Sequence, residues 1–214
     1  MPIRMKRLSR SDPNYKDHEF KFYHSWCHDE KSAKVKSIYL ASRDDIDKSY
    51  RGQRFFTYLY RNGGSYKRLY HGTSRACHIG ESGNDLKLCH DDDCGTCGIL
   101  RQSFKLKYAN DEGMFGPGIY STPNSSKADV YVKNHYVSSN LHAMLICYVV
   151  ASKPQRKLLA DHDITRPSRG FNCVEGVTIN NGGSLQYPEF VVYREDAIVP
   201  VGLIMYTRKG WEPL

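Results

Sequence analysis

The sequence predicts an α+β domain whose sheet is largely antiparallel. Three observations lead to this fold class: apolar residues recur at helical spacing early in the chain, strand-like apolar runs dominate its later part, and no regular alternation of strands and helices links the two. The 214 residues suit a single domain of moderate size, which can bury a core without disulfide bonds.

The first elements are expected to be a tail and two helices. Residues 1–18 are polar and basic and are expected to form an irregular N-terminal tail, so that one folded domain covers 19–214. Apolar positions from 23 to 41, among them Val35, Ile38 and Tyr39, are spaced nearly as on a helix. A second helix is expected over 43–64, where a pair of glycines ends the pattern.

The remaining elements are expected to be strands, with one further helix among them. That helix lies within 125–137 and has Ser125 or Ser126 as its N-cap. The strongly apolar run 141–152 is the best candidate for a central buried strand. The other strands are expected within 67–72, 115–122, 171–179 and 189–208, the last of which holds more than one.

Composition limits the function classes. The formal net charge of +8 leaves two interpretations open, a basic patch that attracts nucleic acid and an ordinary solvated basic surface. No apolar run is long enough to span a bilayer and no secretory signal is present, so no membrane partner is expected. Seven cysteines, four of them clustered, favour an intracellular location, cytoplasmic or nuclear, over an extracellular disulfide framework.

The cysteine-rich segment "CHDDDCGTC", residues 89–97, predicts a metal site. Together with one cysteine upstream, its spacing offers four thiolates to a closed, tetrahedral structural Zn²⁺ site within an insertion at about 77–97. A disulfide, free thiols and a set that uses His90 are the alternatives. A catalytic zinc is disfavoured because no ligand position stays open for water. The expected ligands are Cys77, Cys89, Cys94 and Cys97. Cys27, Cys147 and Cys173 are expected to be buried or semi-buried.

Three other segments carry side chains suited to ligand binding. "RLYHGT", residues 68–73, places a histidine and a glycine at a strand end. "GMFGPGIYSTPNSSKADVY", residues 113–131, holds Tyr120 and Tyr131, two rings that could enclose a flat aromatic ligand. Glu189 stands at the start of an apolar strand, either exposed at the rim or directed into a site. The plain alternatives are a structural histidine and two core tyrosines.

Together these segments resemble the diphtheria-toxin-like ADP-ribosyltransferases, specifically the catalytic domain of the poly(ADP-ribose) polymerase group, with its His–Tyr–Glu triad. The matching segments are "LYHGT", "FGPGIYSTPNSSKADVY" and "EGVTINNGGSLQYPEFVVYREDAIVPVGLI", and the resemblance runs from about residue 20 to the C-terminus. It implies the ADP-ribosyltransferase fold, with N-terminal helices and a split antiparallel sheet. The tankyrase branch also has a small zinc site, but after the second motif, so the cysteine loop here is only loosely similar.

The resemblance implies an enzyme that cleaves the nicotinamide glycosidic bond of NAD and transfers ADP-ribose to an acceptor protein, the chain itself included. His71 would hold the adenosine-side ribose and Gly72 the nicotinamide carboxamide. Tyr120 and Tyr131 would flank the nicotinamide ring, and Glu189 would stabilise the developing cation. The implied catalytic residues are Glu189, His71 and Tyr120. The implied NAD-binding residues are His71, Gly72, Thr73, Tyr120, Ser126, Lys127 and Tyr131.

One departure from the family pattern concerns donor binding. Ala128 stands where the family has a serine that donates to the carboxamide, so NAD binding is expected to be weaker or its pose shifted. Mono- and poly-ADP-ribosylation both remain open. Two alternative functions remain as well: a catalytically silent module that binds NAD or ADP-ribose, and transfer to nucleic-acid phosphate ends.

Overall fold

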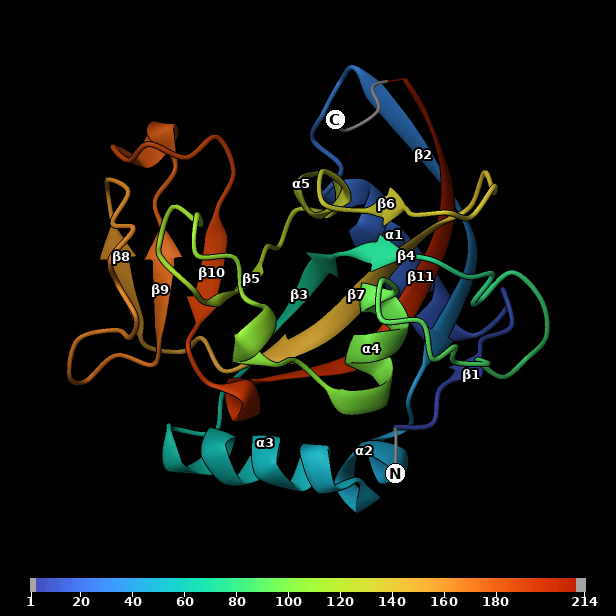
Figure 1. The fold of residues 1–214 in the computed structure, drawn as a ribbon, viewed down its shortest axis with the longest axis horizontal. Helices are drawn as coiled ribbons and strands as arrows, with labels where there is room; N and C mark the ends of the chain where they lie inside the picture. Colours follow the sequence, from blue (N-terminus) through green and yellow to red (C-terminus); the bar gives the residue numbers. More distant parts are fainter. Residues whose placement is uncertain (1–2, 211–214) are drawn as a thin grey trace.

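The computed structural model describes residues 3–210 as two β-sheets, a two-stranded ribbon and five short α-helices (Figure 1). The large sheet has five antiparallel strands in the order β1-β2-β11-β7-β3. Their bounds are Lys6–Arg7 for β1, Lys31–Leu40 for β2, Ile198–Gly210 for β11, His142–Val149 for β7 and Lys67–Gly72 for β3. Strand β7 lies inside the sheet, and all its residues except Tyr148 are buried, as the apolar run predicted.

The small sheet stands beside the open edge of β3 (Figure 1). Its order is β5-β10-β9-β8, and only the β8–β9 pair is parallel. The bounds are Ile119–Ser121, Glu189–Val192, Cys173–Gly176 and Pro154–Lys157, in that spatial order. A single antiparallel bridge between Tyr70 of β3 and Thr122 joins the two sheets. The predicted class, α+β with largely antiparallel strands, is therefore confirmed.

Helices and short 3-10 turns surround the sheets. Helices α2 (Arg43–Lys48) and α3 (Tyr50–Arg61) together form the predicted second helix, divided at Ser49, whose hydroxyl accepts from Gly52 N. None of the helices within 3–210 is both long and apolar enough to cross a membrane. The other elements are α1 (Pro13–His24), α4 (Gly95–Gln102), α5 (Ser125–Asp129), η1 (Leu106–Tyr108), η2 (Ile179–Asn181), η3 (Glu195–Ala197) and the parallel ribbon of β4 (Ser74–Arg75) and β6 (Lys133–Asn134).

The expected irregular tail over 1–18 is wrong for the part that the structure describes. Ile3 and Met5 are buried while Arg4 and Lys6, which alternate with them, are exposed, and this is the alternation of a half-buried strand. Helix α1 then begins at Pro13, and the Asp12 side chain accepts from Asn14 N. The alternation of apolar and charged residues and the Asp12–Pro13 helix start are both present in the sequence, but the high charge of the segment obscures them.

The first predicted helix, over 23–41, is also wrong, because most of that segment is strand β2. Val35, Ile38 and Tyr39 have the spacing of a helical face, but in the strand Ile38 lies on the face opposite to the other two, and all three are buried because both faces are covered there. What decides is the partner: β2 pairs with β11 from Leu40↔Gly202 to Lys31↔Gly210, with an irregularity between Met205 and Tyr206. Such pairing depends on a segment about 170 residues away and leaves no local signature.

Candidate functional site

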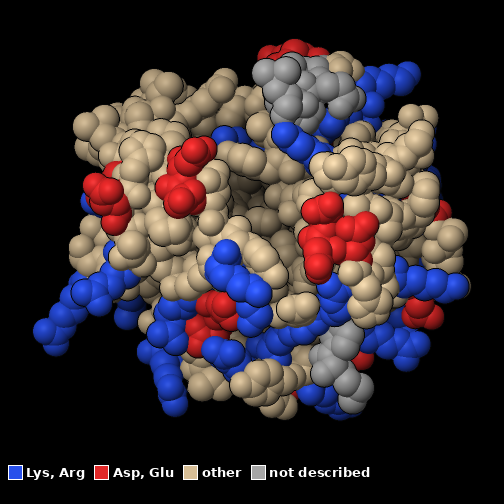
Figure 2. All heavy atoms as spheres, in the orientation of Figure 1, with Lys and Arg blue, Asp and Glu red and all other residues tan. Residues whose placement is uncertain are grey.

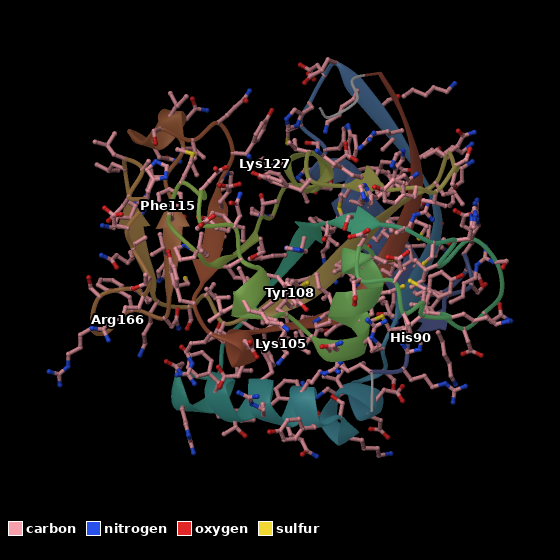
Figure 3. The ribbon with its side chains drawn as sticks, viewed as in Figure 1. His90, Lys105, Tyr108, Phe115, Lys127 and Arg166 are labelled. Atoms are coloured by element: carbon pink, nitrogen blue, oxygen red, sulfur yellow. The ribbon has the colours of Figure 1, made fainter. Side chains whose placement is uncertain are left out.

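A cleft of ≈ 810 Å³ opens where the two sheets part, and Figure 2 shows this face of the molecule hollowed near its centre. In Figure 3, Lys127 lies above the opening while Lys105 and Tyr108 lie below it. Residues that are far apart in the sequence line this cleft together. Of the expected site residues, His71, Gly72, Thr73, Tyr120, Lys127, Tyr131 and Glu189 line it, as does Ala128.

Glu189 is the buried carboxylate of the cleft. It is the first residue of β10, pairs with Gly176 of β9 and has 4% of its surface exposed. Lys127 Nζ lies 3.3 Å from Glu189 Oε1, and the Tyr131 hydroxyl donates to the same oxygen at 3.3 Å. Among the described residues, Lys127 and Tyr131 both contact the Glu189 carboxylate at Oε1, so Oε2 is available to a ligand.

Lys127 carries a stabilised positive charge beside that carboxylate. Its Nζ donates to the Tyr131 hydroxyl at 3.2 Å and lies 5.1 Å from the centre of the Tyr131 ring. Burial opposes the charge, but the nearby Glu189 carboxylate and Tyr131 together raise the pKa of Lys127. At neutral pH the ammonium therefore stays protonated and holds Glu189 Oε1 in place.

His71 presents a hydrogen-bond acceptor to the cleft. Its Nδ1 is 2.8 Å from the Tyr120 carbonyl oxygen, and its ring meets Phe104 edge-on at 4.9 Å between centroids. Burial lowers the pKa of His71, so the imidazole is neutral at pH 7. Because a carbonyl only accepts, Nδ1 carries the proton and Nε2 keeps its lone pair. A ligand hydroxyl can donate to that lone pair.

Gly72 directs its backbone into the cleft. The Tyr70 N–H and C=O both bond to Thr122, on the side of β3 that faces away from β7. Backbone direction alternates along an antiparallel strand, so the N–H and C=O of Gly72 point to that same side. The position also requires glycine, because a Cβ there would lie 2.0 Å from the carbonyl oxygen of Ala128 in α5.

The two tyrosines differ in how firmly they are held. The Tyr120 hydroxyl donates to Gly116 O at 2.9 Å and accepts from Phe115 N at 2.8 Å, while Gly113 leaves space for it. Burial raises the pKa of Tyr120 to about 12, so it is a neutral, fixed ring. Tyr131 is 48% exposed, and within residues 3–210 its hydroxyl bonds to the Lys127–Glu189 pair alone.

Ser126 takes no part in the cleft, contrary to the expectation. It is fully buried, accepts from Cys27 N at 2.8 Å and bonds to His28 Nδ1 at 2.7 Å. The expected serine N-cap is wrong too: Asn124 precedes α5, and its side chain makes no capping bond. Ser125 donates instead to Phe22 O at 2.6 Å, so both hydroxyls fix α5 to the end of α1 and the segment after it.

A buried ionic cluster that the sequence does not predict is centred on Asp129, the last residue of α5. The Asp129 carboxylate accepts hydrogen bonds from Lys31 Nζ at 2.7 Å, from Arg208 Nη1 at 2.8 Å and from the Tyr206 hydroxyl. Lys31 also donates to Ser126 O at 2.9 Å. The side chains of Lys31 and Asp129 are completely buried. No local pattern marks these residues, because β2, α5 and β11 bring them together.

The four expected metal ligands do come together. The Sγ atoms of Cys77, Cys89, Cys94 and Cys97 all lie within 4.8 Å of one another and could hold a metal ion. Cys77 Sγ is 3.6 Å from Cys97 Sγ and 3.8 Å from Cys94 Sγ, and all four cysteines are unoxidised. A hydrogen bond from Cys97 lowers the pKa of Cys94, the N-cap of α4, to about 5, which favours a thiolate there.

The remaining cysteines and His90 stand apart from this group. His90 is exposed and is not among the four grouped ligands. Cys147 and Cys173 are buried, as expected. Cys27 is exposed, so the expectation that it is buried or semi-buried is wrong.

The cysteine cluster is hydrogen-bonded to β4, which begins two residues after β3, the strand that carries His71. Ser74 Oγ donates to Asp93 O at 2.8 Å and accepts from Gly95 N at 3.1 Å, and Thr96 Oγ1 donates to Ser74 O at 3.0 Å. Cys94 and the exposed carboxylates Asp91, Asp92 and Asp93 line the cleft. The cluster therefore sets the position of one wall of the cleft. No model of a known protein family matches the chain.

Proposed function

We propose that the chain is an NAD-dependent ADP-ribosyltransferase and that the cleft holds its donor site. One observation carries the proposal: His71, Tyr120 and Glu189, from three separate segments, line one cleft together with Lys127 and Tyr131. A buried carboxylate, a neutral imidazole acceptor, an open strand edge and two aromatic rings are the groups that a charged, planar donor with two riboses requires.

Each of these groups would bind the part of the donor that matches its chemistry. The nicotinamide carboxamide both donates and accepts, which suits the Gly72 C=O and N–H. Tyr120 and Tyr131 offer faces to the cationic ring, a contact worth about 1–2 kcal/mol when partly desolvated. His71 Nε2 would accept from a hydroxyl of the adenosine-side ribose, and Glu189 Oε2 from a hydroxyl of the other ribose.

The reaction breaks the bond between the ribose C1′ and the nicotinamide nitrogen. The electron pair leaves with neutral nicotinamide, and positive charge develops on the ribose. Glu189 stabilises that charge, and Lys127 with Tyr131 holds the carboxylate in place. An acceptor nucleophile then bonds to C1′ and releases its proton to Glu189 or to solvent. We take the acceptor to be a protein side chain.

Zinc is the metal that the cysteine cluster fits best. Four thiolates without a carboxylate or carbonyl in the set favour a soft, tetrahedral ion, and four protein ligands leave no position for a catalytic water. Bound there, zinc would supply structure alone. The residues that would hold it are Cys77, Cys89, Cys94 and Cys97, and its effect on the donor site would pass through Ser74, which bonds to the same loop.

The function is tested by incubating the protein with NAD and following two quantities together, nicotinamide released and the intact mass of the chain. Release with added ADP-ribose mass supports transfer, and the number of increments distinguishes mono- from poly-ADP-ribosylation. NAD binding by calorimetry with neither release nor added mass would instead establish the silent binding module. Release without added mass would show hydrolysis and contradict self-modification.

Restoring the family serine should tighten donor binding. Ala128 lines the cleft and is almost completely buried, so a hydroxyl in Ala128→Ser would face the donor. One added hydrogen bond is worth about 1 kcal/mol, which predicts a roughly fivefold lower KM for NAD with kcat nearly unchanged. Ala143→Ser, a buried alanine in β7, serves as the matched control. An unchanged KM would show that the carboxamide lies elsewhere.

Loss of the metal should destabilise the fold and weaken donor binding. Elemental analysis of the purified protein should find one zinc per chain, and Cys94→Ser should lose it. Because α4 and the cleft wall depend on the cluster, we expect the melting temperature to fall by about 5 °C or more. The exposed Cys27→Ser is the control and should keep both zinc and stability. Zinc-free protein with unchanged melting and NAD affinity would contradict the structural role.

A further inference from the structure

A second cavity, ≈ 570 Å³ in volume, lies at the β1 edge of the large sheet. In Figure 1 this edge is on the opposite side of the molecule from β8. We call the cavity the basic groove, because its charged lining consists of five cations and one carboxylate. These are Arg4, Lys6, Arg7, Arg10, Lys36 and Asp85.

The fold builds the groove from segments that it holds firmly. Burial of Ile3 and Met5 turns Arg4 and Lys6 outward. On one side β1 pairs with β2, with Arg7 opposite Tyr39. On the other side Arg7 N donates to Asn84 O at 2.9 Å, so residues 84–85 form the far wall. Lys6, Arg7 and Lys36 therefore stand on paired strands, and Arg10 lies in the turn that precedes α1.

The charge in the groove is concentrated and largely uncompensated. Five cations and one carboxylate give a formal charge of +4, which is half of the +8 of the whole chain. Arg4 pairs with Asp85 at 3.6 Å. Within residues 3–210, Lys6, Arg7, Arg10 and Lys36 have no carboxylate partner, whereas many cations elsewhere are paired, such as Lys21, Arg43 and Lys105. Like charges gathered in one concavity attract a polyanion.

We propose that the basic groove binds the phosphate backbone of double-stranded nucleic acid. Arginine and lysine together suit phosphate oxygens, and a duplex offers about one negative charge per 1.7 Å of its length. Among the described residues of the lining, Tyr15 is the only aromatic one, and at 2% exposure it cannot stack on a base. Leu8 is the only aliphatic side chain in the described lining and is partly buried, so the described part of the groove offers no apolar anchor to a membrane surface.

The same lining predicts how binding behaves. Contacts to phosphates alone carry no sequence information, so duplexes of different sequence bind about equally. Without stacking, single strands bind more weakly than duplexes of the same length. The site lies outside the cleft residues, and the proposal holds whether or not the cleft transfers ADP-ribose.

Fluorescence anisotropy with a short labelled duplex tests the proposal. The groove variant carries Arg7→Glu, Arg10→Glu and Lys36→Glu. The control carries Lys153→Glu, Arg166→Glu and Arg169→Glu, three cations outside the groove, with the same change in net charge; Figure 3 shows Arg166 pointing away from the body of the molecule. The control should bind nearly as the wild type does. The groove variant should bind at least about tenfold more weakly, and its slope of log K against log salt should be smaller by roughly 2–3.

A second groove variant and two competing ligands test the proposal further. If the groove variant does not fold by circular dichroism, the neutral variant with Gln at the same three positions replaces it and should show the same direction of change. Equal affinities of the groove and control variants would overturn the proposal. So would single strands or anionic lipid vesicles that bind the wild type as tightly as the duplex does.

Discussion

Under the proposed function, replacing Glu189 by Gln should lower the rate of ADP-ribose transfer by about 10²–10³-fold while NAD binding changes little. Glutamine keeps the shape and hydrogen-bonding capacity of the side chain but removes its charge. The carboxylate is buried and held at Oε1 by Lys127 and Tyr131, so it is positioned before the reaction begins. Its charge matters most when the ribose becomes cationic, and the loss should therefore appear in kcat rather than in KM.

The measurement is nicotinamide release under saturating NAD, with calorimetric NAD affinity and circular dichroism on the same samples. Glu175→Gln is the matched control: Glu175 lies opposite Phe190 in the neighbouring strand and is half-buried near Arg156. We expect that control to stay within about twofold of the wild-type rate. A Glu189→Gln protein that folds, binds NAD and transfers at the wild-type rate would refute the role given to Glu189.

Replacing Asp129 by Ala should lower the free energy of unfolding by about 3–5 kcal/mol. The variant leaves Lys31 and Arg208 without the carboxylate between them, and both cationic side chains are nearly or completely buried. The burial of Lys31 already lowers the pKa of its ammonium, which shows how much the charged form depends on Asp129. Helix α5, which carries Lys127, should loosen as well, so NAD binding should weaken before the protein unfolds.

Urea unfolding of matched variants measures the effect. Asp47→Ala removes an exposed carboxylate that pairs with Arg43 at 2.8 Å and should cost less than about 1 kcal/mol. The double variant Lys31→Met with Asp129→Ala should cost less than the two single variants added together, because removal of one partner makes the other expendable. Additive costs, or an Asp129→Ala cost equal to that of Asp47→Ala, would show that the ionic cluster contributes little.

Several features of the site could be predicted from the sequence because their signals are local. The spacing of Cys89, Cys94 and Cys97 brings three thiols to one turn, and the structure adds Cys77 as expected. The glycine after His71 marked a strand end, and β3 does end there. Glu189 was expected at the start of a strand and begins β10. The donor role of these residues remains a proposal that the resemblance and the geometry support.

Other features depended on segments remote in the chain. Strand β2 was mistaken for a helix because Val35, Ile38 and Tyr39 have helical spacing and the strand, buried on both faces there, shows no clear alternation. Only pairing with β11 selects the extended form. The direction of the Ser126 hydroxyl, toward the segment after α1 rather than the cleft, follows from how α1 and α5 pack. The sequence by itself determined the fold class, the thiol cluster and most of the residues that line the cleft. Tertiary structure decided which segments pair and what lies buried between them, because sheet pairing and charge burial join residues that no local pattern connects.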